Sequence, residues 1–308
     1  MDYFFNIFTN ILLPIFIVIL AGAIINTIFK LDINTLSKVQ FNLFIPAIIF
    51  IKLYESNLEG SVVVSVTLVC LGVIGAMSLI SLIIGRSLSF SKSETSAFIN
   101  SASYYNGGNF SLPLMQLLFD NPLALSIQAI IYFIQTITLF TTGVITASSG
   151  KGSIKNAFFY ILKMPLIYVM ILAFILKGFD IKIYTPIMDS IKIIGNGFSS
   201  LAIITLGAQL ANINIVSLDY KVVLSTLLRL IMGPVLAFAF VSILKITGIT
   251  AQVLIIAMSA PTAVNVALTA IELDNEPEMA SQSVFLSTLL SSITVTIVIW
   301  VVFAIIPA

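Results

Sequence analysis

Long apolar stretches follow one another along almost the whole chain, and this pattern limits the fold more than any other feature. A helix needs about 20 apolar residues to cross the hydrocarbon core of a bilayer. The chain divides at its polar turns into stretches of about that length, and no gap is long enough for a soluble domain. The sequence therefore predicts an all-α membrane protein with ten transmembrane helices. The predicted spans cover residues 7–28, 35–54, 61–85, 95–118, 122–147, 155–177, 186–211, 220–245, 251–273 and 280–306.

The composition agrees with this class and disfavours several others. Charged residues make up 9% of the 308 residues, whereas soluble domains carry about 25%. The formal net charge is +1 and no long basic run is present, so nucleic acid is not an expected partner. The chain has no histidine, no convincing pair of nucleophile and base, and a single cysteine, Cys70. We therefore expect no metal site, no cofactor and no enzyme activity.

Basic residues in the short loops give an orientation, because cytoplasmic loops carry an excess of lysine and arginine. The side of the loops after the odd-numbered spans holds Lys30, Lys38, Arg86, Lys92, Lys151, Lys155 and Lys221. The other side holds Lys52, Lys177, Lys182, Lys192 and Lys245. The first side is therefore predicted to be cytoplasmic. The chain is expected in the cell (inner) membrane as a multi-pass protein, with both termini extracytoplasmic.

The two halves of the chain share local features. Asp120-Asn121-Pro122 precedes the fifth span, and Asp274-Asn275-Glu276-Pro277 precedes the tenth. Because five spans per half is an odd number, the second half must insert upside down, and inverted repeats are typical of secondary transporters. The predicted organisation is a first repeat over 1–147, a connecting loop over 148–154 and a second, inverted repeat over 155–308. The alternative is a chance similarity between short polar turns.

Two spans contain residues that interrupt a helix. The fourth holds Asn106-Gly107-Gly108-Asn109, followed by Pro113, and the ninth holds Pro261-Thr262-Ala263-Val264-Asn265. Glycine and proline are poor helix formers. A pair of spans interrupted in this way points to the binding site of a transporter. The alternative is a pair of proline kinks with asparagines that bond neighbouring helices. Kinks are the expected role of four further prolines, Pro14, Pro46, Pro165 and Pro234.

A half-helix that begins inside the membrane presents free N–H groups and the positive end of its dipole, which attract carboxylates. Neutral polar side chains add hydrogen bonds to a ligand that must also be released. The candidate substrate-binding residues are therefore Asn106, Gly107, Gly108, Asn109, Pro261, Thr262 and Asn265, with Asn42, Pro46 and Gln128 from neighbouring spans. Gln135 and Tyr132 are further candidates for the same cavity.

Charges inside the spans are few. Arg229 lies well inside the eighth span, where a charge is costly unless it is paired or faces water. Arg229 could attract an anion or hold a gate, or it could form a structural ion pair. Asp189 and Glu272 lie near span ends and are the candidates for coupling to Na⁺ or H⁺. Potential-driven movement of an anion needs no such residue, because one charge crossing 100 mV is worth about 2.3 kcal/mol.

Several motifs together resemble the auxin efflux carrier family, which includes bacterial malate and malonate permeases and the plant PIN-FORMED carriers. They extend over essentially the whole chain: Asn42-Leu-Phe-Ile-Pro46, Tyr105-Asn106-Gly-Gly-Asn109-Phe-Ser-Leu-Pro113, Leu206-Gly207-Ala208-Gln209-Leu210, Arg229 with Gly233-Pro234, and Ala260-Pro261-Thr262-Ala263-Val264-Asn265. One departure matters. The plant carriers have a long central hydrophilic loop between spans 5 and 6, whereas here these spans are joined only by Ser148 to Lys155. We therefore carry over neither the phospho-regulation of that loop nor auxin as natural substrate.

The resemblance implies two inverted five-helix repeats in which helices 4 and 9 are broken and cross near the membrane centre, as in bile-acid transporters and sodium/proton antiporters. It also implies a homodimer. Spans 1, 2, 6 and 7 would form a scaffold, and spans 3–5 and 8–10 a transport domain that moves as an elevator. The crossing would fall at Asn106 to Asn109 and Pro261 to Asn265.

The sequence therefore predicts a secondary active or potential-driven carrier of small organic anions. Expected substrates are mono- or dicarboxylates such as malate or malonate, with auxin-like acids as further candidates. One alternative is a sodium- or proton-coupled carrier of another small solute. Another is a transporter-like membrane sensor that binds without transport.

Overall fold

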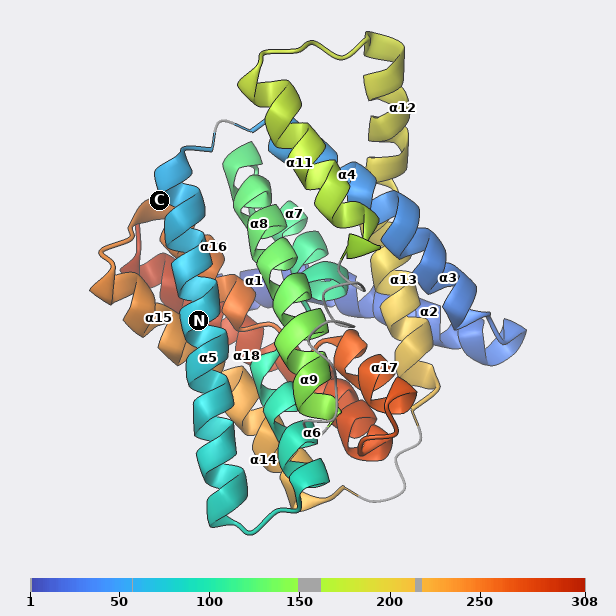
Figure 1. Cartoon of the computed structure of the whole chain (residues 1–308), viewed down its shortest axis with the longest axis vertical. Coiled ribbons are helices and arrows are strands. Elements are labelled where there is room, and N and C mark those ends of the chain that lie inside the picture. Colours follow the sequence, from blue (N-terminus) through green and yellow to red (C-terminus); the bar gives the residue numbers. More distant parts are fainter. Residues whose placement is uncertain (1, 57, 149–161, 214–217, 308) are drawn as a thin grey trace.

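The computed structural model describes residues 2–56, 58–148, 162–213 and 218–307 (Figure 1). These residues form helices joined by short turns, with no β-strand among them and one isolated antiparallel bridge between Tyr105 and Thr262. The prediction of an all-α protein is confirmed for this part of the chain. Of the predicted connecting loop 148–154, only Ser148 lies within the described residues, and the predicted span 155–177 is described from Leu162 onward.

The helices of the first half follow the predicted spans, with some π-helical turns, labelled η, inserted between α-helices. In order they are α1 (Asp2–Ile7), η1 (Phe8–Leu12), α2 (Leu13–Phe29), α3 (Ile33–Val39), η2 (Gln40–Phe44), α4 (Ile45–Tyr54), α5 (Gly60–Ser87), α6 (Lys92–Ser103), η3 (Gly107–Ser111), α7 (Leu112–Leu118), α8 (Pro122–Thr138), η4 (Leu139–Gly143) and α9 (Val144–Ala147). The described helices of the second half are α11 (Pro165–Gly178), α12 (Thr185–Asn196), α13 (Phe198–Ala211), α14 (Tyr220–Leu227), η5 (Leu228–Met232), α15 (Gly233–Ile243), α16 (Gly248–Met258), α17 (Val264–Glu272) and α18 (Pro277–Ile305).

Seven of the ten predicted spans are continuous helices. Among the described residues, the helices long and apolar enough to cross a membrane are Tyr3–Phe29, Ile33–Tyr54, Gly60–Ser87, Pro122–Ala147, Thr185–Ala211, Tyr220–Ile243 and Pro277–Ile305. The predicted spans 95–118 and 251–273 are each divided into two helices, α6 with α7 and α16 with α17. The predicted span 155–177 contributes α11, a shorter apolar helix.

Proline explains most of the π-helical turns. Within the described chain, four of the five turns are followed two residues later by proline, as Pro14, Pro46, Pro113 and Pro234. A proline inside a helix lacks an N–H, and its ring clashes with the carbonyl four residues earlier. The wider turn makes room for the ring, and such turns are frequent at functional sites. Pro14, Pro46 and Pro234 thus lie inside continuous helices, whereas Pro165 stands in the first turn of α11.

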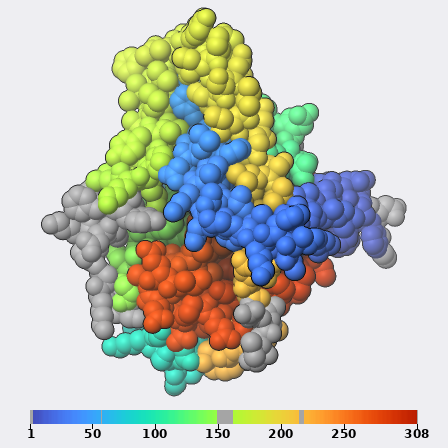
Figure 2. Space-filling view, turned by 90° about the vertical axis from the view of Figure 1, so that its right-hand side faces the viewer, coloured from blue at the N-terminus to red at the C-terminus, as the bar shows by residue number. Residues whose placement is uncertain are grey.

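The helices pack in two groups. In the first, α2 lies against α13, and α4 lies against α11 and α12. In the second, α5 packs on α6, α8 and α15, while α14, α16 and α17 pack on α18. Figure 2 shows the blue N-terminal helices against the yellow helices of the first group, above the orange-red C-terminal helices. Contacts between the groups include α4 with α8, and α13 with α7 and η3.

Large apolar side chains are exposed along the outer helices. They include Ile17, Leu20, Ile24, Leu68, Leu79, Ile293, Ile297 and Trp300. Soluble proteins rarely expose long apolar faces, whereas lipid tails are as apolar as leucine. These faces of α2, α5 and α18 are therefore suited to contact with a bilayer.

Candidate functional site

The two predicted interruptions lie side by side in the structure. α6 ends at Ser103 and η3 begins at Gly107, while α16 ends at Met258 and α17 begins at Val264. Between these ends, Tyr105 pairs with Thr262 in the antiparallel bridge. We term residues 104–106 and 261–263 together the crossing.

Backbone hydrogen bonds join the two segments of the crossing. The Asn106 N–H donates to the Pro261 carbonyl at 2.7 Å, and the Ala263 N–H donates to the Tyr104 carbonyl at 3.0 Å. At membrane depth, backbone groups freed by a broken helix must be satisfied by protein or by water in a cavity. The backbone groups freed by one break form hydrogen bonds with those freed by the other, which explains why two spans can be broken at one place.

Thr262 connects the crossing to two neighbouring helices by hydrogen bonds. Its Oγ1 donates to the Ser101 carbonyl at 2.8 Å, and its N–H donates to the Ser287 hydroxyl at 3.0 Å. The side chain is fully buried. Thr262 therefore ties the crossing to α6 and α18 and has no hydroxyl proton left for a ligand.

The helices η3 and α17 both begin at one small pocket, which we term the crossing pocket. It is lined by Phe41, Tyr105, Asn106, Gly107, Gly108, Asn109, Tyr132, Gln135, Ala263, Val264 and Asn265. The first N–H groups of a helix have no partner within it, and each helix N-terminus carries about +0.5 elementary charge. The crossing pocket therefore collects the positive ends of two helices without any charged side chain among its lining residues.

Asn106 supplies a side-chain donor to the same pocket. As the N-cap of η3, its Oδ1 accepts from the Asn109 N–H at 3.0 Å. Its Nδ2 is buried and has no hydrogen-bond partner among the described residues. A buried unpaired donor costs about 1–3 kcal/mol, which a ligand acceptor would recover. The pocket has a volume of about 10 Å³, room for one water molecule, so it is too small for an organic anion in this conformation.

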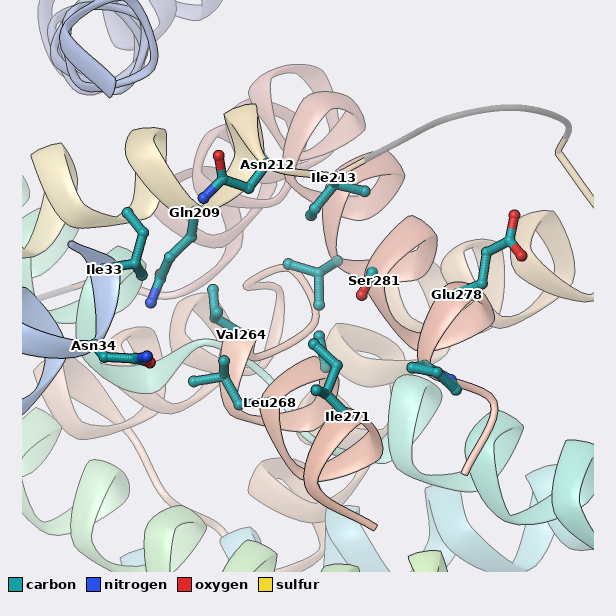
Figure 3. A pocket seen from close by; sticks show the side chains of 13 residues that line it. Ile33, Asn34, Gln209, Asn212, Ile213, Val264, Leu268, Ile271, Glu278 and Ser281 are labelled. Atoms are coloured by element: carbon teal, nitrogen blue, oxygen red, sulfur yellow. The ribbon is translucent and has the colours of Figure 1, made fainter. Parts of the chain in front are cut away.

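Two larger cavities adjoin the crossing pocket. The α18 cavity, of about 590 Å³, lies between the start of α3, the end of α13, α17 and the start of α18, and it shares Val264 with the crossing pocket. In Figure 3, Asn34, Gln209 and Leu268 surround its space. The α11 cavity, of about 610 Å³, shares Phe41, Tyr132 and Asn265 with the crossing pocket. Both cavities are lined by residues next to the turns that follow α2 and α17, so both lie at the same end of the molecule.

Charged side chains line the α11 cavity. Among the described residues they are Lys38, Lys163 and Glu272, two lysines against one glutamate. Asp32 lies just before α3 and caps it by accepting from the Asn34 N–H at 3.1 Å. A hydrogen bond from the Thr35 hydroxyl lowers the pKa of the Asp32 carboxyl, so this carboxylate is ionised at neutral pH and engaged at the helix start. The lining of the α11 cavity is positive on balance, which suits an anionic ligand.

Comparison with known proteins fits this architecture. Residues 7–299 match the family described as membrane transport protein. The chain belongs to the membrane transport protein family. A relative from Methanothermobacter thermautotrophicus, described as an uncharacterized transporter, is 29% identical over 300 residues, which cover 93% of this chain and 95% of the relative. The family assignment confirms the resemblance to the auxin efflux carriers, and it indicates a multi-pass membrane transporter rather than an enzyme.

In this transporter, most of the predicted site residues lie at the crossing or beside it. The crossing pocket is lined by Asn106, Gly107, Gly108, Asn109 and Asn265. Asn265 also lines the α11 cavity together with Asn42 and Glu272. Pro261 and Thr262 form the backbone of the crossing itself.

Other predicted residues support the crossing or lie away from it. Gln128 is fully buried, and its Nε2 donates to the Gly107 carbonyl at 2.9 Å. Pro46 is buried in α4 and lines neither of the two cavities. Asp189 is exposed on α12 and lines neither cavity. Arg229 is fully buried beside the crossing and lines none of the three spaces.

Two residues of η2 lie at the site although the sequence did not indicate them as site residues. The Gln40 side chain is buried and its Nε2 donates to the Asn109 Oδ1. Phe41 lines both the crossing pocket and the α11 cavity. The sequence could have indicated Gln40, because it is a polar residue in an apolar span, two positions before Asn42.

Proposed function

We propose that this transporter is a secondary active or potential-driven carrier of small organic anions, most simply mono- or dicarboxylates. The observation that carries the proposal is the crossing pocket, where two helix N-termini and the unpaired Nδ2 of Asn106 meet. All of these groups donate hydrogen bonds, and helix N-termini favour carboxylates. Because none of the described residues that line the pocket is charged, an anion would be held strongly enough to bind and weakly enough to leave.

Access to the pocket supports transport by alternating access. The α18 and α11 cavities lead to the crossing pocket from one end of the molecule, the end predicted to be cytoplasmic. The lysines of the α11 cavity would raise the local concentration of anions at its mouth. We propose that this conformation is the inward-facing one.

The two packing groups support an elevator movement. They coincide with the scaffold and the transport domain that the family resemblance implies. Among the described residues, three side-chain hydrogen bonds join the groups: Gln40 to Asn109, Ser199 to Gln116, and Ser126 to the Lys52 carbonyl. We propose two inverted five-helix repeats, in which α6–α7 corresponds to α16–α17, and a homodimer built on the scaffold.

The test is a transport current from purified protein in liposomes, recorded on a solid-supported membrane with malate, malonate, succinate, lactate and indole-3-acetate. A saturable current is expected with at least one of them. Asn265→Ala removes a lining side chain, and Asn106→Asp keeps the N-cap acceptor but replaces the Nδ2 donor. Since a hydrogen bond to a charged group is worth about 1.5–3 kcal/mol, each variant should weaken apparent affinity about 10- to 100-fold.

Asn10→Ala is the matched control, because Asn10 is exposed on η1 and its side chain, within the described part of the chain, bonds only to Asn6. It should transport as the wild type does. Unchanged currents in both Asn106→Asp and Asn265→Ala would remove the site from the crossing pocket. Strict dependence on sodium would favour the cation-coupled alternative, and binding without any flux would favour the sensor.

The orientation is tested with cysteines at the two ends of α5. Cys70 is buried, so the wild type is an unlabelled control. Ser61 and Ser87 are exposed and lie at opposite ends of α5, and Ser61→Cys and Ser87→Cys are conservative substitutions. In intact cells, a membrane-impermeant maleimide should label Ser61→Cys and should label Ser87→Cys only after permeabilisation. The reverse pattern would place both termini in the cytoplasm.

A further inference from the structure

Arg229 lies between the C-terminal ends of the two broken helices. Its side chain belongs to η5 and is fully buried. Nη1 donates to the carbonyl oxygens of Ala102 and Ser103, both at 3.1 Å, and Nη2 donates to the Met258 carbonyl at 2.5 Å. One guanidinium thus binds the last carbonyls of α6 and α16 together.

Helix ends balance the charge of Arg229. The ion pairs within the described residues are Lys192–Glu55, Lys221–Glu94 and Lys221–Asp219, so no carboxylate pairs with this guanidinium. Each helix C-terminus carries about −0.5 elementary charge, and two of them supply about one negative charge. The Tyr105 ring covers the guanidinium, with 5.5 Å between the ring centroid and Cζ. Tyr105 in turn lines the crossing pocket.

Gly233 makes room for the guanidinium. A Cβ at this position would lie 1.8 Å from the Arg229 Nη2 and 2.6 Å from the Met258 carbonyl oxygen. Gly233 follows Arg229 by four residues, about one helical turn. The spacing of these two residues therefore lets the guanidinium reach the Met258 carbonyl.

In transporters with broken helices, the carbonyls of unwound segments and of half-helix C-termini coordinate the coupling cation. Here the carbonyls at the C-terminal ends of α6 and α16 hold a guanidinium. We propose that Arg229 is a built-in cation that takes the place of a coupling sodium ion between α6 and α16 and positions the crossing without sodium. The meaning of this for transport rests on the proposed carrier function, whereas its effect on the crossing does not require a substrate.

Three forms of the protein separate this role from ordinary packing. The wild type carries its cation covalently, so sodium should not stabilise it. Arg229→Lys keeps a cation near the same carbonyls but loses the planar fork of donors. Arg229→Ala leaves three carbonyl oxygens around an empty space, which a sodium ion can enter.

The test is the melting temperature of the purified full-length protein in sodium chloride and in choline chloride at equal ionic strength. The wild type and Arg229→Lys should melt at the same temperature in both salts. Arg229→Ala should melt lower in choline, and sodium should restore part of the loss with a saturable dependence. The proposal would be overturned if sodium raised the melting temperature of the wild type, or if sodium left the melting temperature of Arg229→Ala unchanged.

Where Arg229→Ala yields no folded protein, the wild type and Arg229→Lys still test the proposal, because sodium stabilisation of either one contradicts a built-in cation. The anion current provides the second readout. A sodium response of Arg229→Ala without any anion current in the wild type overturns the proposed function alone. An anion current together with a sodium-indifferent Arg229→Ala overturns only the role of Arg229.

Discussion

Gly207→Ala is expected to remove most of the folded protein from the membrane, because α2 and α13 touch backbone to backbone at this residue. A Cβ at Gly207 would lie 1.9 Å from the Ile19 carbonyl oxygen, and a Cβ at Gly22 would lie 2.3 Å from the Ile204 carbonyl oxygen. Backbone atoms cannot turn away as a side chain can. The two helices would have to separate along their whole contact.

Separation would also break the polar link between these helices. The Asn26 Nδ2 donates to the Ala208 carbonyl at 3.2 Å and to the Asn212 Oδ1 at 2.8 Å. Small residues permit such close approach in membranes, where packing and interhelical hydrogen bonds hold helices together. Overpacking typically costs about 1–3 kcal/mol, and we expect Gly207→Ala to reach the upper end of that range.

The measurement is the yield of monodisperse protein in detergent, followed by its melting temperature. Gly75→Ala is the matched control, because a Cβ at Gly75 in α5 meets no atom within 4 Å. Gly75→Ala should behave as the wild type. A Gly207→Ala protein with wild-type yield and melting temperature would show that the contact between α2 and α13 is looser than described.

The helices were predictable from the sequence because a bilayer fixes the length of an apolar span. Gly107, Gly108 and Pro261 also predicted the interruptions correctly, since local backbone chemistry decides where a helix can continue. The pairing of the two breaks was not derivable from local pattern, because Tyr105 and Thr262 are far apart in the sequence. Only the resemblance to a known family suggested it.

The contacts of individual site residues were less predictable. Asparagine, glutamine and threonine near a break look alike in the sequence, whether they face a ligand or a backbone carbonyl. In the structure Gln128 and Thr262 donate to carbonyls, while Asn106 keeps an unpaired donor. The difference arises because each broken helix must first satisfy its own freed backbone groups. The partners of Arg229 could not be predicted from the sequence either, since they come from α6 and α16 rather than from its own span.

The two adjacent glycines of η3 allow a sharp test of the crossing pocket. A Cβ at Gly108 would lie 2.8 Å from Cε2 of Tyr132, whereas a Cβ at Gly107 would make ordinary contacts, the nearest at 3.4 Å from Oε1 of Gln135. Neither glycine has a positive φ, since Gly248 is the only such glycine within the described chain. Alanine also favours a helix over glycine by about 1 kcal/mol. The two substitutions therefore differ in the space they require.

Gly108→Ala is expected to abolish most transport while the protein still folds. Tyr132 is buried and lines both the crossing pocket and the α11 cavity, so its displaced ring would move within the path proposed for the substrate. Overpacking of about 1–3 kcal/mol at the site would lower the anion current about 5- to 150-fold. Gly107→Ala should keep most of the current. Equal currents in the two variants, at equal yield and melting temperature, would mean that the substrate does not pass between η3 and Tyr132.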